Sequence, residues 1–79
     1  MKVKMYYNGD LIAIRVPSDI GFNALFDKIR DRLKVPEGDQ MQLFYKDEAS
    51  GDKPNLMSDG DLDYALQRNE KLLLFVEVV

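Results

Sequence analysis

The residues best suited to chemistry are six carboxylates that fall within seventeen residues of the chain. They could hold a metal ion, take part in acid–base catalysis, or form a charged surface for a cationic partner. Asp also favours turns and the first turns of helices, so turn and cap formation is the plain structural alternative. The six acids are Asp47, Glu48, Asp52, Asp59, Asp61 and Asp63.

A calcium loop is the first alternative that this segment suggests. Asp59, Asp61, Asp63 and Glu70 have the spacing of positions one, three, five and twelve of an EF-hand loop. The glycine that the loop needs at position six is replaced by Tyr64, and an apolar helical stripe runs through the same residues. Calcium binding is therefore the weaker interpretation of the cluster, and no cofactor is expected.

Catalysis is disfavoured by the residue types that the chain lacks. There is no His and no Cys, which removes the commonest acid–base catalyst, the commonest metal ligand and the thiolate nucleophile. Ser18, Ser50 and Ser58 have no His to activate them, and no Gly-rich phosphate loop is present. We expect no enzymatic activity.

The length and composition are those of one small globular domain. The chain has 79 residues, of which 46% are hydrophobic and 32% charged. No apolar run approaches the ~20 residues that span a bilayer, and neither a membrane anchor nor a secretory signal is expected. The absence of Cys fits a reducing compartment, so we expect a cytoplasmic protein.

The charge is polarised along the chain. Residues 1–34 carry seven Lys or Arg against four acids, a net charge of +3, and residues 35–79 carry four against ten, a net charge of −6. Opposite charges on the two halves suggest two interaction surfaces of opposite sign. The overall charge of −3 disfavours nucleic acid as a partner, because phosphates would be repelled over most of the surface.

Local patterns place these residues on a series of short elements. β-rich segments at 2–7 and 11–16 flank Asn8-Gly9-Asp10, a strong hairpin signal. A helical stripe follows, capped by Ser18 or Asp19 and closed by Pro36 and Gly38. The stripe consists of Phe22, Leu25, Phe26, Ile29 and Leu33.

The second half repeats this alternation. The run 40–45 is a third strand, and a short edge strand ends at Leu56-Met57. Ser58 with Asp61 is an S-x-x-D capping pattern that starts a second helix, which Asn69 ends. The nearly all-apolar run 71–79 is typical of a central strand. The order ββαββαβ predicts an α+β fold of the ubiquitin-like β-grasp type, with two helices on a mixed sheet and the last strand parallel to the first.

The segment from Tyr45 through Asp52, followed by residues 56–62, resembles the acidic OPCA motif of Phox and Bem (PB-one) domains. That motif reads roughly Y-x-D-E-D-G-D, a spacer, then apolar-x-S-D-x-D-L. The run KVKMYY at 2–7 is similar to the basic first strand of the same family, whose fold is the β-grasp. The likeness covers the whole chain and is greatest to the member found in a fungal cell-polarity scaffold. At Ala49-Ser50 the chain lacks the third acid that is usual in the motif, which weakens the acidic face.

The resemblance implies front-to-back pairing, in which a strand Lys of one domain meets the acidic motif of another. It assigns the basic role to Lys4, with Arg15 joining it and Lys2 on the same strand face by the period of two. It assigns the acidic role to the carboxylates Asp47, Glu48, Asp52, Asp59 and Asp61.

The resemblance also implies the class of partner. We expect another Phox and Bem domain, on a Rho-family GTPase exchange factor or on an NADPH-oxidase regulator, at the cell cortex or at sites of polarised growth. Weak head-to-tail self-association is expected as well, because the chain carries both faces. The 79 residues are expected to be cut from a longer scaffold. The alternative binding function is that of a Ras-association or other ubiquitin-like domain.

Overall fold

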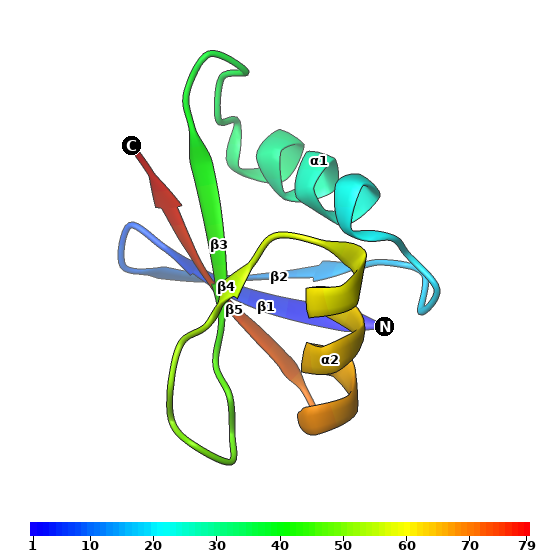
Figure 1. Ribbon diagram of the computed structural model, residues 1–79. Coiled ribbons are helices and arrows are strands. Elements are labelled where there is room, and N and C mark those ends of the chain that lie inside the picture. Colours follow the sequence, from blue (N-terminus) through cyan, green and yellow to red (C-terminus); the bar gives the residue numbers. More distant parts are fainter.

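The computed structural model describes all of residues 1–79 and has the predicted order of elements (Figure 1). No helix in it is long and apolar enough to cross a membrane. The five strands are β1 (Lys2–Tyr7), β2 (Asp10–Arg15), β3 (Met41–Tyr45), β4 (Asn55–Leu56) and β5 (Leu72–Val78), and the two helices are α1 (Phe22–Leu33) and α2 (Asp59–Arg68).

The first hairpin turns where the Asn-Gly pair predicted it. Asn8 has φ 51° and Gly9 has φ 82°, the left-handed values that a type I′ turn requires at both central residues. β1 and β2 then pair antiparallel, with Lys2 opposite Arg15 and Tyr6 opposite Leu11. This register places each of those pairs on one face of the sheet.

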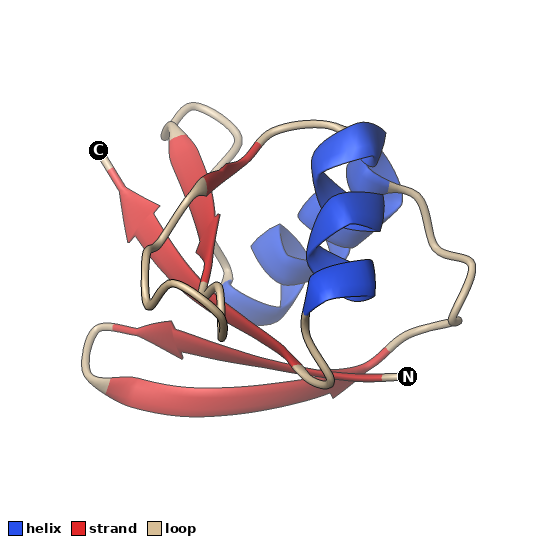
Figure 2. Cartoon of the chain, turned by 60° about the horizontal axis from the view of Figure 1, so that its bottom comes forward, coloured by secondary structure: helices blue, strands red, loops and turns tan.

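The sheet confirms the predicted β-grasp arrangement. Its strand order is β2-β1-β5-β3-β4, with β5 in the centre, parallel to β1 and antiparallel to β3. Figure 2 shows both helices on the same side of this sheet. Between the helices and the sheet lies a core of fifteen buried apolar residues, among them Val3, Met5, Leu25, Ile29 and Leu74.

The start of α1 differs from the sequence prediction. Neither Ser18 nor Asp19 caps the helix; the N-cap residue is Gly21, which has no side chain to accept a hydrogen bond. The carboxylate of Asp59, at the start of α2, instead accepts a hydrogen bond from the Phe22 N–H at 2.6 Å. The cap therefore comes from 37 residues further along the chain, where no local pattern could reveal it.

The end of α1 also lies earlier than Pro36. Lys34 is the C-cap residue and adopts a left-handed conformation with φ 57°. The backbone N–H of Lys34 donates to the carbonyls of Arg30 and Asp31 in the last turn. The helix therefore ends before the predicted Pro36-Gly38 stop.

Candidate functional site

The strand pattern assigns the three predicted basic residues to the outer face of the sheet, with Arg15 on the edge strand β2, next to α1. Lys4 alternates along β1 with Val3 and Met5, which are fully buried under the helices, so its side chain points to the opposite side. Lys2 lies two residues earlier on that face and pairs with Arg15. None of these cations forms an ion pair within the chain. They are therefore free to meet acids of a partner.

Two further lysines join Lys4, and the sequence analysis missed both. The Lys46 N–H donates to the Leu73 carbonyl at 3.0 Å, and Leu73 lies opposite Lys4 in the parallel pairing of β1 and β5. Lys71 directly precedes β5. Lys4, Lys46 and Lys71 consequently line one groove of about 310 Å³. They are distant in sequence, and only the strand register brings them together.

Arg15 lies away from this groove. It borders a separate depression near α1, together with Lys28, Asp31 and Arg32. Lys2 stays with Lys4 and Lys71, since the three line a second cavity at the start of β1. The basic face thus has Lys4 at its centre, Lys2 and Lys71 on one side of it, and Arg15 at its edge.

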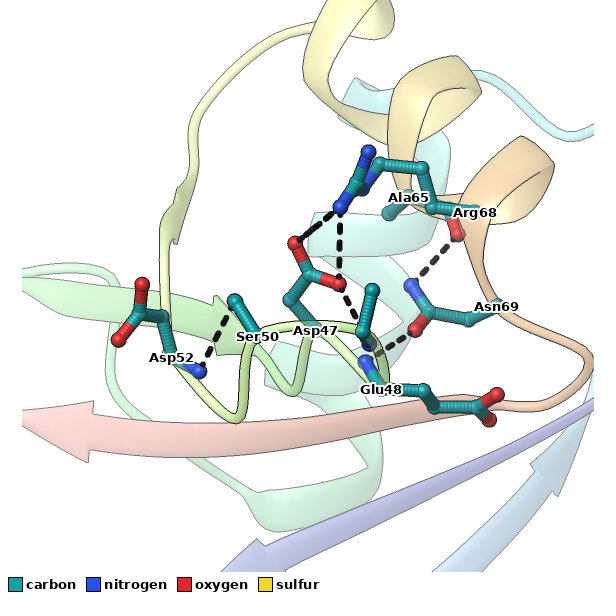
Figure 3. Close-up of polar contacts among 8 residues, drawn as sticks. Asp47, Glu48, Ser50, Asp52, Ala65, Arg68 and Asn69 are labelled. Carbon is teal, nitrogen blue, oxygen red and sulfur yellow. Dashed lines mark hydrogen bonds and ion pairs between the residues drawn. The ribbon is translucent and has the colours of Figure 1, made fainter.

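On the acidic side, Asp47 is engaged within the chain. Only 7% of this residue is exposed. Its carboxylate accepts hydrogen bonds from Arg68 Nε at 3.1 Å and from the Ala49 N–H at 3.0 Å, and it forms the one ion pair of the structure (Figure 3). Sequence reasoning did not find Arg68, which lies on the last turn of α2.

Asn69 attaches the acidic loop, which is the segment 46–54 between β3 and β4, to the end of α2. Its side-chain oxygen accepts from the Glu48 N–H at 2.8 Å, and its side-chain nitrogen donates to the Ala65 carbonyl at 2.8 Å. Asn69 was predicted to end the helix, and it is the C-cap residue. It also holds Asp47 and Glu48 in place beside the helix (Figure 3).

These contacts lower the pKa of Asp47. Burial acts to raise the pKa of this carboxyl, but the hydrogen bond from Ala49 and the hydrogen bond and charge of Arg68 outweigh it. The pKa therefore lies below the ordinary value of an Asp.

The lowered pKa predicts an acid-sensitive contribution to stability. A carboxyl with a lower pKa in the folded state stabilises the fold above its unfolded pKa of about 4, and this stabilisation is lost as the pH falls through the folded pKa. From about pH 5 to about pH 2 the melting temperature of the parent should therefore fall more steeply than that of Asp47→Asn, which should be the less stable protein at pH 7.

Thermal melts across this pH range measure the difference. Asp52→Asn is the matched control, because Asp52 is exposed and its carboxylate accepts no hydrogen bond. Parallel curves for the parent and Asp47→Asn would show that the ion pair adds nothing to acid sensitivity.

Asp59 and Asp61 serve the helix starts. Besides the bond of Asp59 to α1, the Ser58 hydroxyl accepts from the Asp61 N–H at 3.2 Å, as the S-x-x-D pattern predicted. The Asp61 carboxylate accepts a hydrogen bond from the Met57 N–H at 2.9 Å. Each carboxylate keeps acceptor capacity beyond one backbone bond, so these structural roles leave room for a partner's cation.

Tyr45 joins the two halves of the acidic motif. Burial raises the pKa of its phenol, and repulsion from the nearby charge of Asp47 adds to the effect, with a smaller contribution from Asp61. The charges of both carboxylates act on Tyr45 although Asp47 and Asp61 are fourteen residues apart. The acidic face consists of this cluster with the exposed Asp52 and Asp59 at its margin, and with Glu48 where it meets the basic face, since Glu48 also lines the groove around Lys4.

Asp52 and Glu48 are the acids most open to a partner. In Figure 3 the Asp52 carboxylate points away from the Asp47–Arg68 pair. The Glu48 carboxylate makes only one long contact, with the Glu70 N–H at 3.5 Å. No group of three or more acids is arranged to hold a metal ion, and Asp59, Asp61 and Asp63 lie on α2 and not on a loop.

Comparison with known proteins identifies relatives along the full chain. The family model of the PB1 domain matches residues 1–78. The AtNBR1-PB1 filament, solved by cryo-electron microscopy in its L-type form, is 31% identical with a TM-score of 0.85 and covers 100% of this chain and 97% of its own. A separate AtNBR1-PB1 domain structure is 29% identical with a TM-score of 0.82 and the same coverage. No curated protein matches. A special closeness to the fungal polarity member is not shown by these matches.

Proposed function

The chain belongs to the PB1 domain family of protein–protein interaction modules, and we propose that it pairs front to back with other PB1 domains. In this arrangement its basic face contacts one PB1 domain and its acidic face contacts another. Lys4, with Lys2 and Arg15, would bind a partner's acidic motif. Glu48, Asp52, Asp59 and Asp61, with Asp47 behind them, would bind a partner's strand lysine.

The observation that carries this proposal is the separation of the two charged faces. Lys4 points outward from the sheet, whereas Asp61 belongs to α2, on the side of the sheet that the helices cover (Figure 2). One domain can therefore contact two neighbours at once. Such heterologous contacts do not close on themselves and can propagate. The similar AtNBR1-PB1 domain was solved as a filament, which supports propagation here.

The finer biological role rests on the resemblance of the acidic motif. We propose a cytoplasmic scaffold, of which this domain is one part, that recruits a Rho-family GTPase exchange factor at sites of polarised growth. An NADPH-oxidase regulator with the same kind of domain is the second candidate partner. The polarised charge of the two faces supports recognition of an oppositely charged PB1 face in either case.

Self-association tests whether both faces are competent. The parent should associate head to tail at high concentration, and the association should weaken as salt rises, because exposed charge pairs are screened over about 10 Å at 0.1 M. Two variants isolate the faces. The acid-only variant carries Lys4→Ala, and the base-only variant carries Asp52→Asn with Asp61→Asn.

Sedimentation should find each variant monomeric and an equimolar mixture forming one capped heterodimer. Asparagine in place of Asp61 still offers an oxygen to the Met57 N–H, so the fold should persist. A mixture that stays monomeric in low salt at millimolar concentration would reject front-to-back pairing.

A further inference from the structure

Exposed apolar side chains lie at both charged faces. Tyr6 is 41% exposed and Leu11 is 53% exposed, and the two pair across β1 and β2 on the outer face that carries Lys4. On the other side of the sheet, Tyr64 of α2 is 47% exposed. Both charged faces therefore present large apolar groups to solvent.

The groove beside Lys4 is an apolar depression with a basic rim. The exposed Tyr6 and Leu11 and the half-buried Leu73 supply its apolar walls, and Lys4, Lys46 and Lys71 also line it. Glu48 is the one acid in its lining.

The Tyr6 wall of this groove is held in place. The ring of Tyr6 stacks on Phe75, with centroids 5.6 Å apart and an angle of 16° between the planes. A stacked ring loses little freedom when a partner binds against it. The groove is therefore largely formed before any contact.

Tyr64 has the complementary surroundings. It lies three residues after Asp61 and four before Arg68, so the three side chains share one face of α2. The Arg68 guanidinium lies 5.1 Å from the Tyr64 ring and is itself held 3.1 Å from Asp47. Tyr64 is thus an exposed aromatic group held against Arg68, beside the Asp61 carboxylate, which has no cation partner within the chain.

We propose that Tyr64 of one copy of this chain docks in the groove formed by Tyr6, Leu11 and Leu73 of the next copy. This inference rests on the proposed front-to-back pairing and gives that contact an apolar centre. Charge complementarity selects a second copy as the occupant, since Asp61 beside Tyr64 and the other open acids of the acidic face would meet Lys4, Lys46 and Lys71 around the groove. Aromatic anchors in the centre of an interface commonly carry a large share of binding energy.

An apolar centre changes the expected response to salt. Screening weakens the charge pairs but leaves burial of the Tyr64 ring intact. The contact should therefore keep part of its affinity at high salt, and that remaining part should depend on Tyr64.

The experiment measures the affinity of the acid-only variant for the base-only variant by titration calorimetry. Adding Tyr64→Ala to the acid-only variant, or Leu11→Ala to the base-only variant, should each weaken binding about tenfold. The combined loss should be smaller than the product of the single losses, because both changes remove the same contact. Tyr64→Phe keeps the ring and should bind nearly as the parent does. Val79→Ala, which trims another exposed apolar side chain outside the groove and outside the acidic motif, should change nothing.

The outcomes separate this inference from the pairing on which it rests. If the acid-only and base-only variants do not bind each other, front-to-back pairing is wrong and the inference falls with it. If they bind and Tyr64→Ala leaves the affinity unchanged, pairing stands and the docking of Tyr64 is wrong. The docking of Tyr64 would also be wrong if the affinity losses from Tyr64→Ala and Leu11→Ala multiply fully, because the two side chains would then act independently. Circular dichroism of every variant checks that the fold is retained, as expected for exposed positions.

Discussion

Introducing Lys4→Ala into the base-only variant should abolish its measurable binding to the acid-only variant. Removing one member of a desolvated charge pair costs about 2–5 kcal/mol of binding, because the partner's acids are left unpaired. The loss corresponds to about 30-fold at the lower bound and several thousandfold at the upper. Lys4 has no internal ion pair, so its removal should leave the stability of the fold nearly unchanged.

Two measurements make this result specific. Titration calorimetry gives the affinity, and thermal melts confirm that the variant is folded. Lys34→Gln is the charge-matched control, since Lys34 is exposed at the end of α1 and lines neither the groove around Lys4 nor the depression beside Arg15. Equal losses for Lys4→Ala and Lys34→Gln would mean that overall charge drives the association and that no site exists at Lys4.

The parts of this molecule that could be predicted from sequence are those encoded by neighbouring residues. The Asn8-Gly9 turn needs only two adjacent residues with positive φ, and the cap of α2 needs only Ser58 and Asp61. The central position of β5 followed from its nearly continuous apolar run. Each signal acts over a few residues, and the structure confirms each one.

The contacts that sequence reasoning missed join residues far apart in the chain. Asp47 pairs with Arg68 across 21 residues, and Asp59 caps α1 across 37. Lys46 reaches the side of Lys4 only because β5 inserts between β1 and β3. Such contacts depend on strand register and on the angle between helices, which the type and spacing of residues do not encode locally.

These missed contacts refine the predicted acidic face. The resemblance assigned the acidic role to Asp47 and Asp52 alike, yet Asp47 is buried against Arg68 while the Asp52 carboxylate has no partner. Asp47 consequently holds the acidic loop to α2, which positions the more open acids around it. Its replacement should affect stability first and binding second.

Replacing Asp52 and Asp61 together by Asn in the acid-only variant should remove most of its binding to the base-only variant. The expected loss is about 2–5 kcal/mol, because a partner's lysine would be brought to a surface without its carboxylates. The matched control is Asp27→Asn with Glu37→Gln, which removes the same amount of charge from exposed positions on and after α1.

Stability must be followed alongside this binding measurement, because Asp61 also accepts the Met57 N–H. An Asn side chain keeps an acceptor oxygen but replaces a charged acceptor by a neutral one, so Asp61→Asn should lower the melting temperature only slightly. Asp59→Asn should lower it more, because the bond of Asp59 to the Phe22 N–H is shorter, 2.6 Å against 2.9 Å, and joins the two helices. A double variant that melts like the parent and still binds like the parent would show that Asp52 and Asp61 serve only turns and caps. The acidic face would be assigned to these two carboxylates if the double variant melts normally and no longer binds, while the control variant melts normally and still binds.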